Sequence, residues 1–245
     1  MAGQRDGRTT GRNGGAAGRW DGPRRVSLFR PADERGAVTA DHHDRIPPET
    51  RASIRRAADA VADGDLVVYP TETVYGLGAD ALDPDAVGRV FDLKGRERDD
   101  PLSLGVDGIA RAQRYTRPGE RALAFMRAFL PGPVTVVVER EPTVPDALTG
   151  GRDRVGVRVP DHPVALALLR ETGPLTATSA NVSGHGSVRR VADLDGRIRE
   201  GVAAVVDDGE TDGVESTVVD PESGTVHRRG AMASAIEAWL SDPPV

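Results

Sequence analysis

Apolar residues recur along the chain at two spacings, which separate the predicted helices from the predicted strands. Between residues 48 and 64 they follow the i, i+3, i+4, i+7 pattern of an amphipathic helix, at Ile54, Ala57, Ala58 and Val61. Similar patterns, with Asp83-Pro84 and Pro131 as boundaries, predict helices at residues 84–94, 162–169, 191–199 and 232–240, and two more between residues 106 and 131.

Short apolar runs predict the strands, at residues 66–69, 102–106, 134–139, 155–159, 174–178, 203–206, 216–220 and 225–228. Residues 71–78, 141–153 and 179–187 are predicted loops. Strands alternate with helices, and several C-terminal strands are joined by turns too short for a parallel crossover. This arrangement predicts one α/β domain with a mixed sheet.

Residues 1–46 are rich in glycine and arginine and show no apolar periodicity. We therefore expect a disordered tail over residues 1–46 and a folded domain over residues 47–242. His42 and His43 lie in this tail, where we interpret them as solvated residues rather than metal ligands. His162, at the start of a predicted helix, is interpreted as a capping or packing residue.

Charge and composition narrow the class of protein. The net charge is −6, and residues 37–245 hold 24 basic and 34 acidic side chains, a balance of −10. An acidic surface argues against nucleic-acid binding through a broad cationic face but allows a local basic cleft. The chain has no cysteine, which excludes disulfides, thiolate metal sites and cysteine nucleophiles. No apolar run approaches the ~20 residues of a membrane helix, so we expect a cytoplasmic protein.

Lys94 is the only lysine among the 32 basic residues. Arginine presents a planar fork and lysine a compact point charge, so a single retained lysine indicates a place that needs the ammonium itself. The alternative is a lysine retained by chance on a solvated helix end, and composition alone does not decide between them.

Three known site motifs are not matched. The dinucleotide fingerprint needs a third glycine that opens a helix directly, which Gly76 and Gly78 lack. The phosphate loop of NTPases ends in Gly-Lys-Ser/Thr, whereas Lys94 precedes its glycine. Ser179 and Ser183 lack the Gly-x-Ser-x-Gly turn of a hydrolase nucleophile.

Lys94, Arg96 and Arg98 form a cationic cluster within five residues, and a triphosphate is the natural ligand for it. The loop at residues 179–187 adds hydroxyls and flexible glycines, which suit a second contact with phosphate or ribose. Taken alone, that loop is more typical of an ordinary turn rich in serine and glycine.

Six segments in this order resemble the YrdC/TsaC family of threonylcarbamoyl-AMP synthases. They are Tyr69–Gly78, Lys94-Gly95-Arg96 with Pro101-Leu102, Pro131–Thr135, Arg158-Val159-Pro160, Thr178–Gly184 and Ser216–Asp220. The resemblance implies a twisted, open α/β sheet with a concave, positively charged central cleft. It also implies a nucleotidyltransferase that makes threonylcarbamoyl-AMP and pyrophosphate from L-threonine, bicarbonate and ATP, for N6-threonylcarbamoyladenosine at tRNA position 37.

The same resemblance assigns roles to residues. Lys94 and Arg96 would be catalytic, with Mg²⁺ arriving with ATP and no metal held by the protein itself. The implied ATP-binding residues are Lys94, Arg98, Ser179, Asn181 and Arg228. The implied threonine-binding residues are Thr71, Arg96, Arg158 and Ser216.

Two departures from the family pattern affect these expectations. Many relatives have asparagine before the Pro-Leu pair and histidine shortly after it, whereas this chain has Asp100 and then Ser103-Leu104-Gly105. The chain also ends soon after the synthase-like region, so we expect the short form of the family. The implied partners are a downstream threonylcarbamoyl transferase complex and tRNA, with no membrane contact.

Two other classes of function stay open from the sequence alone. A non-catalytic protein that binds double-stranded RNA or tRNA through a basic cleft is the main alternative. A pyridoxal phosphate enzyme with Lys94 as its Schiff base is the other.

Overall fold

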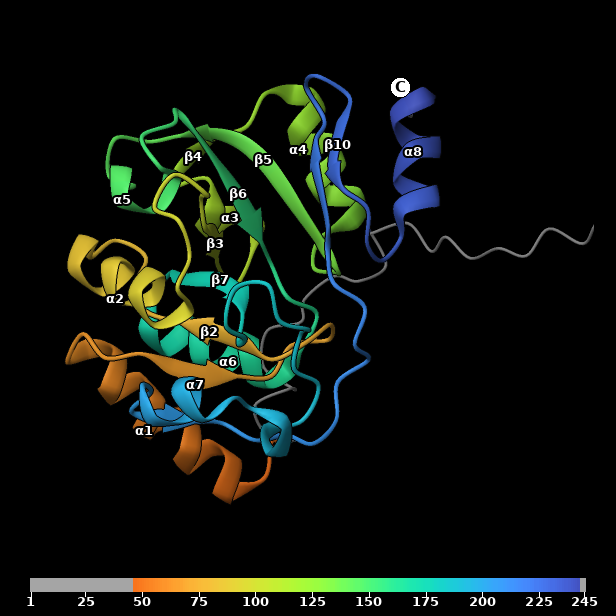
Figure 1. The fold of residues 1–245 in the computed structure, drawn as a ribbon. Helices are drawn as coiled ribbons and strands as arrows, with labels where there is room; N and C mark the ends of the chain where they lie inside the picture. Colours follow the sequence, from red (N-terminus) through yellow and green to blue (C-terminus); the bar gives the residue numbers. More distant parts are fainter. Residues whose placement is uncertain (1–45, 243–245) are drawn as a thin grey trace, which may run out of the picture.

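The computed structural model describes residues 46–242, which form one mixed sheet with helices packed on it (Figure 1). The strands are β1 (Val67–Tyr69), β2 (Gly76–Gly78), β3 (Ser103–Gly105), β4 (Thr116–Arg117), β5 (Val134–Arg140), β6 (Arg154–Arg158), β7 (Leu175–Ser179), β8 (Ala204–Val205), β9 (Thr217–Asp220) and β10 (Thr225–Arg228). The helices are α1 (Pro48–Ala62), α2 (Pro84–Lys94), α3 (Ile109–Ala112), α4 (Glu120–Phe129), α5 (Asp146–Thr149), α6 (Pro163–Thr172), η3 (Val191–Asp193), α7 (Gly196–Glu200) and α8 (Ala233–Ser241).

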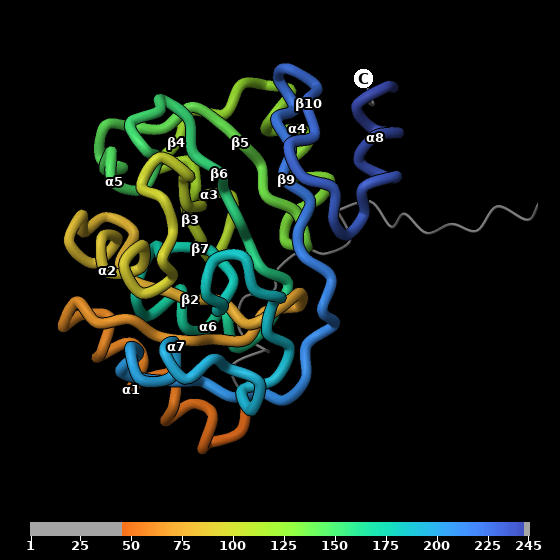
Figure 2. Tube along the Cα trace, in the orientation of Figure 1, coloured from red at the N-terminus to blue at the C-terminus, as the bar shows by residue number. Residues whose placement is uncertain are grey.

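The strand order is β10-β9-β5-β6-β3-β7-β2-β1-β8, with β4 paired to β5 beside this path. The pairs β1·β8, β3·β6 and β5·β9 are parallel and the other pairs are antiparallel. The predicted α/β class with a mixed sheet is therefore confirmed. A long connection, residues 206–216, runs from β8 at one edge of the sheet to β9 near the other, as the Cα trace shows (Figure 2).

The predicted helices form where their boundary residues placed them. The Asp83 side chain accepts a hydrogen bond from the backbone N–H of Asp85 (2.9 Å), and Gly95 ends α2 in the left-handed conformation. In α1 the predicted stripe is buried at Ile54, Ala57 and Val61. The predicted helix at 191–199 is instead divided into η3 and α7.

Residues 76–78 correct the prediction of a loop, because they form β2 between β1 and β7. The two glycines of this strand serve close packing. A Cβ on Gly76 or Gly78 would approach the ring of Tyr69 to 3.0 or 2.9 Å. The strand therefore requires glycine at both positions, and it carries the chain directly past the ring of Tyr69.

Two further short elements lie where no regular structure was predicted. Strand β4 pairs with the end of β5, and the single turn of α5 lies inside the predicted loop at residues 141–153. On α4 the buried face includes Phe125, Met126 and Phe129, whereas Leu123 is only half-buried. Phe125 and Phe129 pack against Trp239 of α8, which fixes α8 on α4.

The core lies on both faces of β1, whose residues alternate between two clusters. Val68 packs in the larger cluster, under α2 and α4, while Val67 and Tyr69 pack in the smaller one, under α1 and α6. Ile46 belongs to the smaller cluster and is 4% exposed. Otherwise the predicted tail, including His42 and His43, lies outside the described residues.

His162 is the N-cap residue of α6, although its side chain makes no capping hydrogen bond. Its Nε2 lies 3.6 Å from Oδ2 of Asp208, and burial lowers its pKa, which Asp208 partly opposes. Within residues 46–242, no helix has the length and apolar content needed to cross a membrane.

Candidate active site

A cavity of about 630 Å³ lies over the middle of the sheet, with walls from the loop after β1, the loop after α2 and the connection before β9. Alternation along β6 shows how the sequence builds it. Arg154, Gly156 and Arg158 face the cavity, while Val155 and Val157 point into the core on the opposite face. A cavity of this volume is typical of small-molecule sites.

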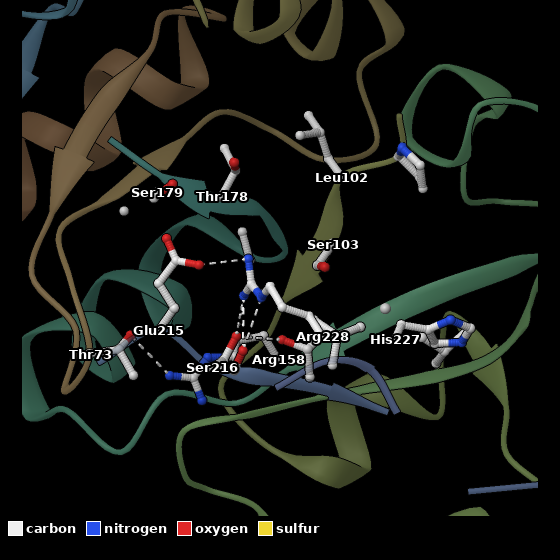
Figure 3. Close-up of a pocket in the computed structure, with 18 of the residues that line it drawn as sticks. Thr73, Leu102, Ser103, Arg158, Thr178, Ser179, Glu215, Ser216, His227 and Arg228 are labelled. Carbon is white, nitrogen blue, oxygen red and sulfur yellow. Dashed lines mark hydrogen bonds and ion pairs between the residues drawn. The ribbon is translucent and has the colours of Figure 1, made fainter. Parts of the chain in front are cut away.

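Small residues make the floor of the cavity. Ser103 and Gly105 of β3, Gly156 of β6 and Ala177 of β7 lie next to one another in the sheet. A Cβ on Gly156 would meet Oγ of Ser103 at 2.7 Å and Cγ2 of Thr135 at 2.8 Å. The floor therefore has no room for a larger side chain at Gly156. The space above the floor stays open (Figure 3).

Charged side chains surround this floor. Of the described residues, the arginines that line the cavity are Arg96, Arg152, Arg154, Arg158 and Arg228. The acidic residues that line it are Asp100, Glu215 and Asp220. The cavity is thus locally positive in a chain with a net charge of −6, as the resemblance implied for the central cleft.

Arg158 is the most buried of these arginines, at 6% exposure. Its Nη2 lies 2.8 Å from Oε1 of Glu72 and donates to Oγ1 of Thr73 at 3.5 Å. Its Nη1 is buried without a hydrogen-bond partner among the described residues. A guanidinium fixed on one side and unpaired on the other is suited to an anionic group of a ligand, such as a carboxylate.

Ser216 and Arg228 form a second polar group in the cavity wall (Figure 3), beside Thr135 of β5. Nη2 of Arg228 donates to both the carbonyl oxygen and Oγ of Ser216, each at 3.0 Å. Oγ of Ser216 also lies 3.1 Å from Oγ1 of Thr135, and Nη1 of Arg228 pairs with Glu215 at 3.0 Å. These contacts hold the hydroxyl and the guanidinium at the cavity wall.

Tyr69 adds a neutral hydroxyl to the lining. Burial raises the pKa of Tyr69 to about 12, with the positive charge of Arg158 opposing the rise. The hydroxyl is therefore protonated at neutral pH, and it donates to the carbonyl oxygen of Thr176 at 3.5 Å.

Comparison with known proteins identifies the family. The family model Sua5_yciO_yrdC, described as Telomere recombination, matches residues 59–230. The chain belongs to the Sua5/YciO/YrdC family.

Two curated relatives carry the same activity in their names. The threonylcarbamoyl-AMP synthase of Bacillus subtilis (strain 168) is 45% identical over 177 residues, which cover 68% of this chain and 49% of the relative. The putative threonylcarbamoyl-AMP synthase of Mycobacterium tuberculosis (strain H37Rv) is 37% identical over 190 residues, which cover 74% and 85%. The chain thus spans about half the length of the first relative and most of the second.

Solved structures of the Sua5/YciO/YrdC family share the fold. P. abyssi Sua5 complexed with L-threonine has 40% identity and a TM-score of 0.67, over 72% of this chain and 54% of that one. E. coli YciO has 26% identity and a TM-score of 0.69, over 76% of this chain and 92% of that one.

The structure brings six of the predicted site residues to the cavity: Thr71, Arg96, Arg158, Ser179, Ser216 and Arg228. Oγ1 of Thr71 donates to the carbonyl oxygen of Val74 (2.6 Å), which folds the loop around it. Arg96 donates to the carbonyl oxygens of Asp100 (2.9 Å) and Pro101 (3.1 Å), so the guanidinium also shapes the loop that carries it.

Lys94 lies behind the cavity wall and is 1% exposed, not on a solvated helix end. Its ammonium donates to the carbonyl oxygens of Ser179 and Asn181, the latter at 2.6 Å. Burial lowers the pKa of Lys94 to about 8, the positive charge of Arg96 adds to this effect, and Glu215 opposes it. The only lysine therefore fixes the turn that carries Ser179.

Asn181 is also outside the lining, at 8% exposure. Its amide donates to the carbonyl oxygens of Val182 (2.9 Å) and His185 (2.7 Å), and Oγ of Ser179 donates to its Oδ1. Arg98 lies further away: it pairs with Asp92 at 2.6 Å and its guanidinium stacks on Phe91. In this conformation neither Asn181 nor Arg98 lines the cavity.

Several lining residues were not predicted, notably Arg152, Arg154, Glu215 and His227. The signal for Arg154 is present in the sequence, because alternation along 154–158 puts it on the same face as Arg158. Glu215 lies on the long connection from β8, whose path no local pattern determines.

No group of three or more histidine, aspartate or glutamate side chains in residues 46–242 is arranged to hold a metal ion. The cavity carboxylates are instead paired with arginines, as Asp220 is with Arg154 at 2.8 Å. Mg²⁺ commonly keeps water and other oxygen ligands beside one or two protein carboxylates, and Glu215 and Asp220 are carboxylates in the lining of this cavity.

Proposed function

We propose that this protein is an L-threonylcarbamoyladenylate synthase, which condenses L-threonine, bicarbonate and ATP to threonylcarbamoyl-AMP, pyrophosphate and water. The observation that carries the proposal is one cavity with a buried, half-paired guanidinium at Arg158 and further guanidinium groups around a floor of small residues. Such a cavity suits a nucleoside triphosphate and the carboxylate of an amino acid at once. The names of the curated relatives support the same activity.

The reaction places two demands on such a cavity. The threonine amine first reacts with bicarbonate to give a carbamate and water, and a carbamate oxygen then attacks the α-phosphorus of ATP as pyrophosphate leaves. Negative charge grows on the phosphoryl oxygens and on the leaving group, so fixed cations lower the barrier. Holding both substrates together also removes the entropic cost of their encounter.

We place the threonine at the Arg158 end of the cavity. Nη1 of Arg158 would bind the substrate carboxylate, because that nitrogen is buried and has no partner among residues 46–242. The hydroxyls of Thr71 and Ser216 line the cavity as neutral contacts. Arg96 would lie between the two substrates and neutralise charge in the transition state.

We place the nucleotide along Ser179 and Arg228, with Lys94 and Asn181 behind them. Lys94 and Asn181 stabilise the turn at 179–185 through main-chain carbonyls, and Ser179 stands at the start of that turn. A direct contact of Lys94 with phosphate requires the ammonium to exchange one of these bonds. For Arg98, an ATP contact requires the loop after α2 to turn inward.

Mg²⁺ is the cofactor we propose, bound to the phosphates of ATP. When bound, it offsets charge on the triphosphate, and Glu215 and Asp220 are cavity carboxylates of the type that can hold it. We further propose that the product passes to a threonylcarbamoyl transferase complex that modifies tRNA, and that tRNA contacts this protein. Since the reaction uses ATP and serves tRNA, we propose a cytoplasmic location.

The test is pyrophosphate release by the purified protein with ATP and Mg²⁺, with and without L-threonine and bicarbonate. We expect release only when both are present. Release that is independent of threonine contradicts the proposal. Salt-sensitive binding of double-stranded RNA with no nucleotide turnover would instead favour the RNA-binding alternative.

A further inference from the structure

Four of the arginines that line the cavity are each paired with a carboxylate within 3.0 Å: Arg96 with Asp100, Arg154 with Asp220, Arg158 with Glu72 and Arg228 with Glu215. Arg152 differs from all of them. Within residues 46–242 it has no carboxylate partner, and its hydrogen bonds go only to main-chain carbonyl oxygens, those of Asp99 (2.7 Å) and Thr149 (3.3 Å). Its positive charge is therefore uncompensated at the cavity wall.

The anchoring of Arg152 leaves much of its guanidinium available. Both hydrogen bonds come from Nη1, whereas Nη2 and Nε make none to other described residues. A guanidinium offers a planar fork of N–H groups that fits two oxygens of a phosphate. Nη1 thus anchors the guanidinium, while Nη2 and Nε remain available to a ligand.

The turn before Arg152 leaves space for the guanidinium of this residue. Gly150 adopts the left-handed conformation, with φ of 60°. A Cβ there would lie 3.0 Å from Nη1 of Arg152 and 3.2 Å from the carbonyl oxygen of Asp99. Glycine at this position therefore leaves room for the contact between Arg152 and Asp99.

The same contact ties Arg152 to the segment of the cavity wall that Arg96 also binds. Arg152 binds the carbonyl oxygen of Asp99, and Nε of Arg96 binds that of Asp100, the next residue. Consecutive Cα atoms are about 3.8 Å apart, so two guanidinium groups are held on one short segment of the wall. At the other end of the cavity, Arg158 follows Arg154 by four residues, or roughly 13 Å of extended strand.

We propose that Arg152 binds the terminal phosphates of the nucleotide and the pyrophosphate that leaves from it. This inference rests on the proposed function and extends it, because it divides the cavity into a carboxylate end at Arg158 and a polyphosphate end at Arg152 and Arg96. An uncompensated cation is the group best suited to gain from a ligand of high negative charge.

The experiment compares Arg152→Gln and Arg152→Lys with Arg199→Gln as the matched control. Arg199 is an exposed arginine outside the cavity lining, and it too donates only to main-chain carbonyls, those of Val191 and Ala192. Calorimetry measures the affinity of each protein for inorganic tripolyphosphate and for AMP, and urea unfolding shows whether each variant is folded.

We expect Arg152→Gln to weaken tripolyphosphate binding about tenfold, ~1.4 kcal/mol, with AMP affinity unchanged. Arg152→Lys should lose less, since it keeps the charge but not the fork, and it serves as the test if Arg152→Gln does not fold. Arg199→Gln should bind as the wild type. Equal tripolyphosphate affinity in wild type and in the Arg152 variants overturns the inference. Because these measurements need no turnover, they remain informative if the wild type makes no adenylate.

Discussion

Nη2 of Arg158 lies 2.8 Å from Oε1 of Glu72, and both side chains are largely buried, at 8% and 16% exposure. The two Glu72 carboxylate oxygens have no hydrogen-bond partner elsewhere among the described residues, so the ion pair is the contact that compensates this charge. Glu72 thereby fixes the orientation of the Arg158 guanidinium, whose Nη1 is buried without a hydrogen-bond partner among the described residues. Glu72, a residue of the loop after β1, thus sets the orientation of Arg158 on β6.

Glu72→Gln should therefore impair threonine binding more than ATP binding. The change leaves the Arg158 charge without its counter-ion, and breaking a buried pair of this kind costs about 3 kcal/mol of unfolding free energy. We expect the KM for threonine to rise about tenfold, ~1.4 kcal/mol, with a smaller change in the KM for ATP. Steady-state kinetics and urea unfolding measure the two effects.

The matched control is Glu171→Gln, on the exposed surface of α6. This substitution should leave the KM for threonine and the free energy of unfolding near their wild-type values. Arg158→Ala provides a second check, because Glu72 can act only through a guanidinium that is present. If Glu72→Gln raises the KM for threonine further in the Arg158→Ala background, Glu72 does not act by positioning Arg158.

The lowered pKa of Lys94 predicts that stability and activity change with pH in opposite directions. The pKa of Lys94 is lowered from 10.5 to about 8 in the fold. Between these values the unfolded chain binds the proton and the folded chain does not, so this residue makes the protein more stable as pH rises from about 8 to 10.5, by at most ~3 kcal/mol. If the ammonium is needed for catalysis, kcat/KM should fall over the same range from an apparent pKa near 8.

Urea unfolding of wild type and Lys94→Met across this pH range isolates the contribution, since both proteins share all other titrating groups. We expect the difference in unfolding free energy between them to change with pH above about 8. A constant difference means that the folded-state pKa of Lys94 is not lowered.

Magnesium should bind with the nucleotide and not to the protein alone. Among residues 46–242 no cluster of acidic or histidine side chains is arranged for a metal ion. We expect EDTA to stop pyrophosphate release and excess Mg²⁺ to restore it. In thermal melts, Mg²⁺ alone should leave the Tm unchanged, while ATP with Mg²⁺ should raise it, because a ligand that binds the folded state stabilises it. A rise in Tm with Mg²⁺ alone would reveal a protein-borne site.

Local patterns were sufficient to predict most of the fold. The helix at Pro84–Lys94 could be bounded because its cap and its terminal glycine are local signals, and β5 because five successive apolar or β-branched residues favour a strand. Strand β2 could not be predicted in this way. Its two glycines are needed only because the ring of Tyr69 packs against them. Such a contact depends on strand pairing, which no short window of sequence contains.

The site was predicted in part for a similar reason. Family motifs pointed to Arg158 and Ser179, which the structure brings to one cavity. The burial of Lys94 against carbonyl oxygens 85 and 87 residues away depends on how α2 docks beside β7, and the composition does not encode it. The uncompensated charge of Arg152 became visible only once every other pairing in the cavity was known.

The most direct test is mass spectrometry of a reaction containing the purified protein, L-threonine, ATP, Mg²⁺ and ¹³C-bicarbonate. We predict a threonylcarbamoyl-adenylate that carries the ¹³C label and is accompanied by pyrophosphate. Neither product should form when threonine is omitted. Consumption of ATP without a labelled adenylate, or an adenylate whose label does not come from bicarbonate, would contradict this prediction.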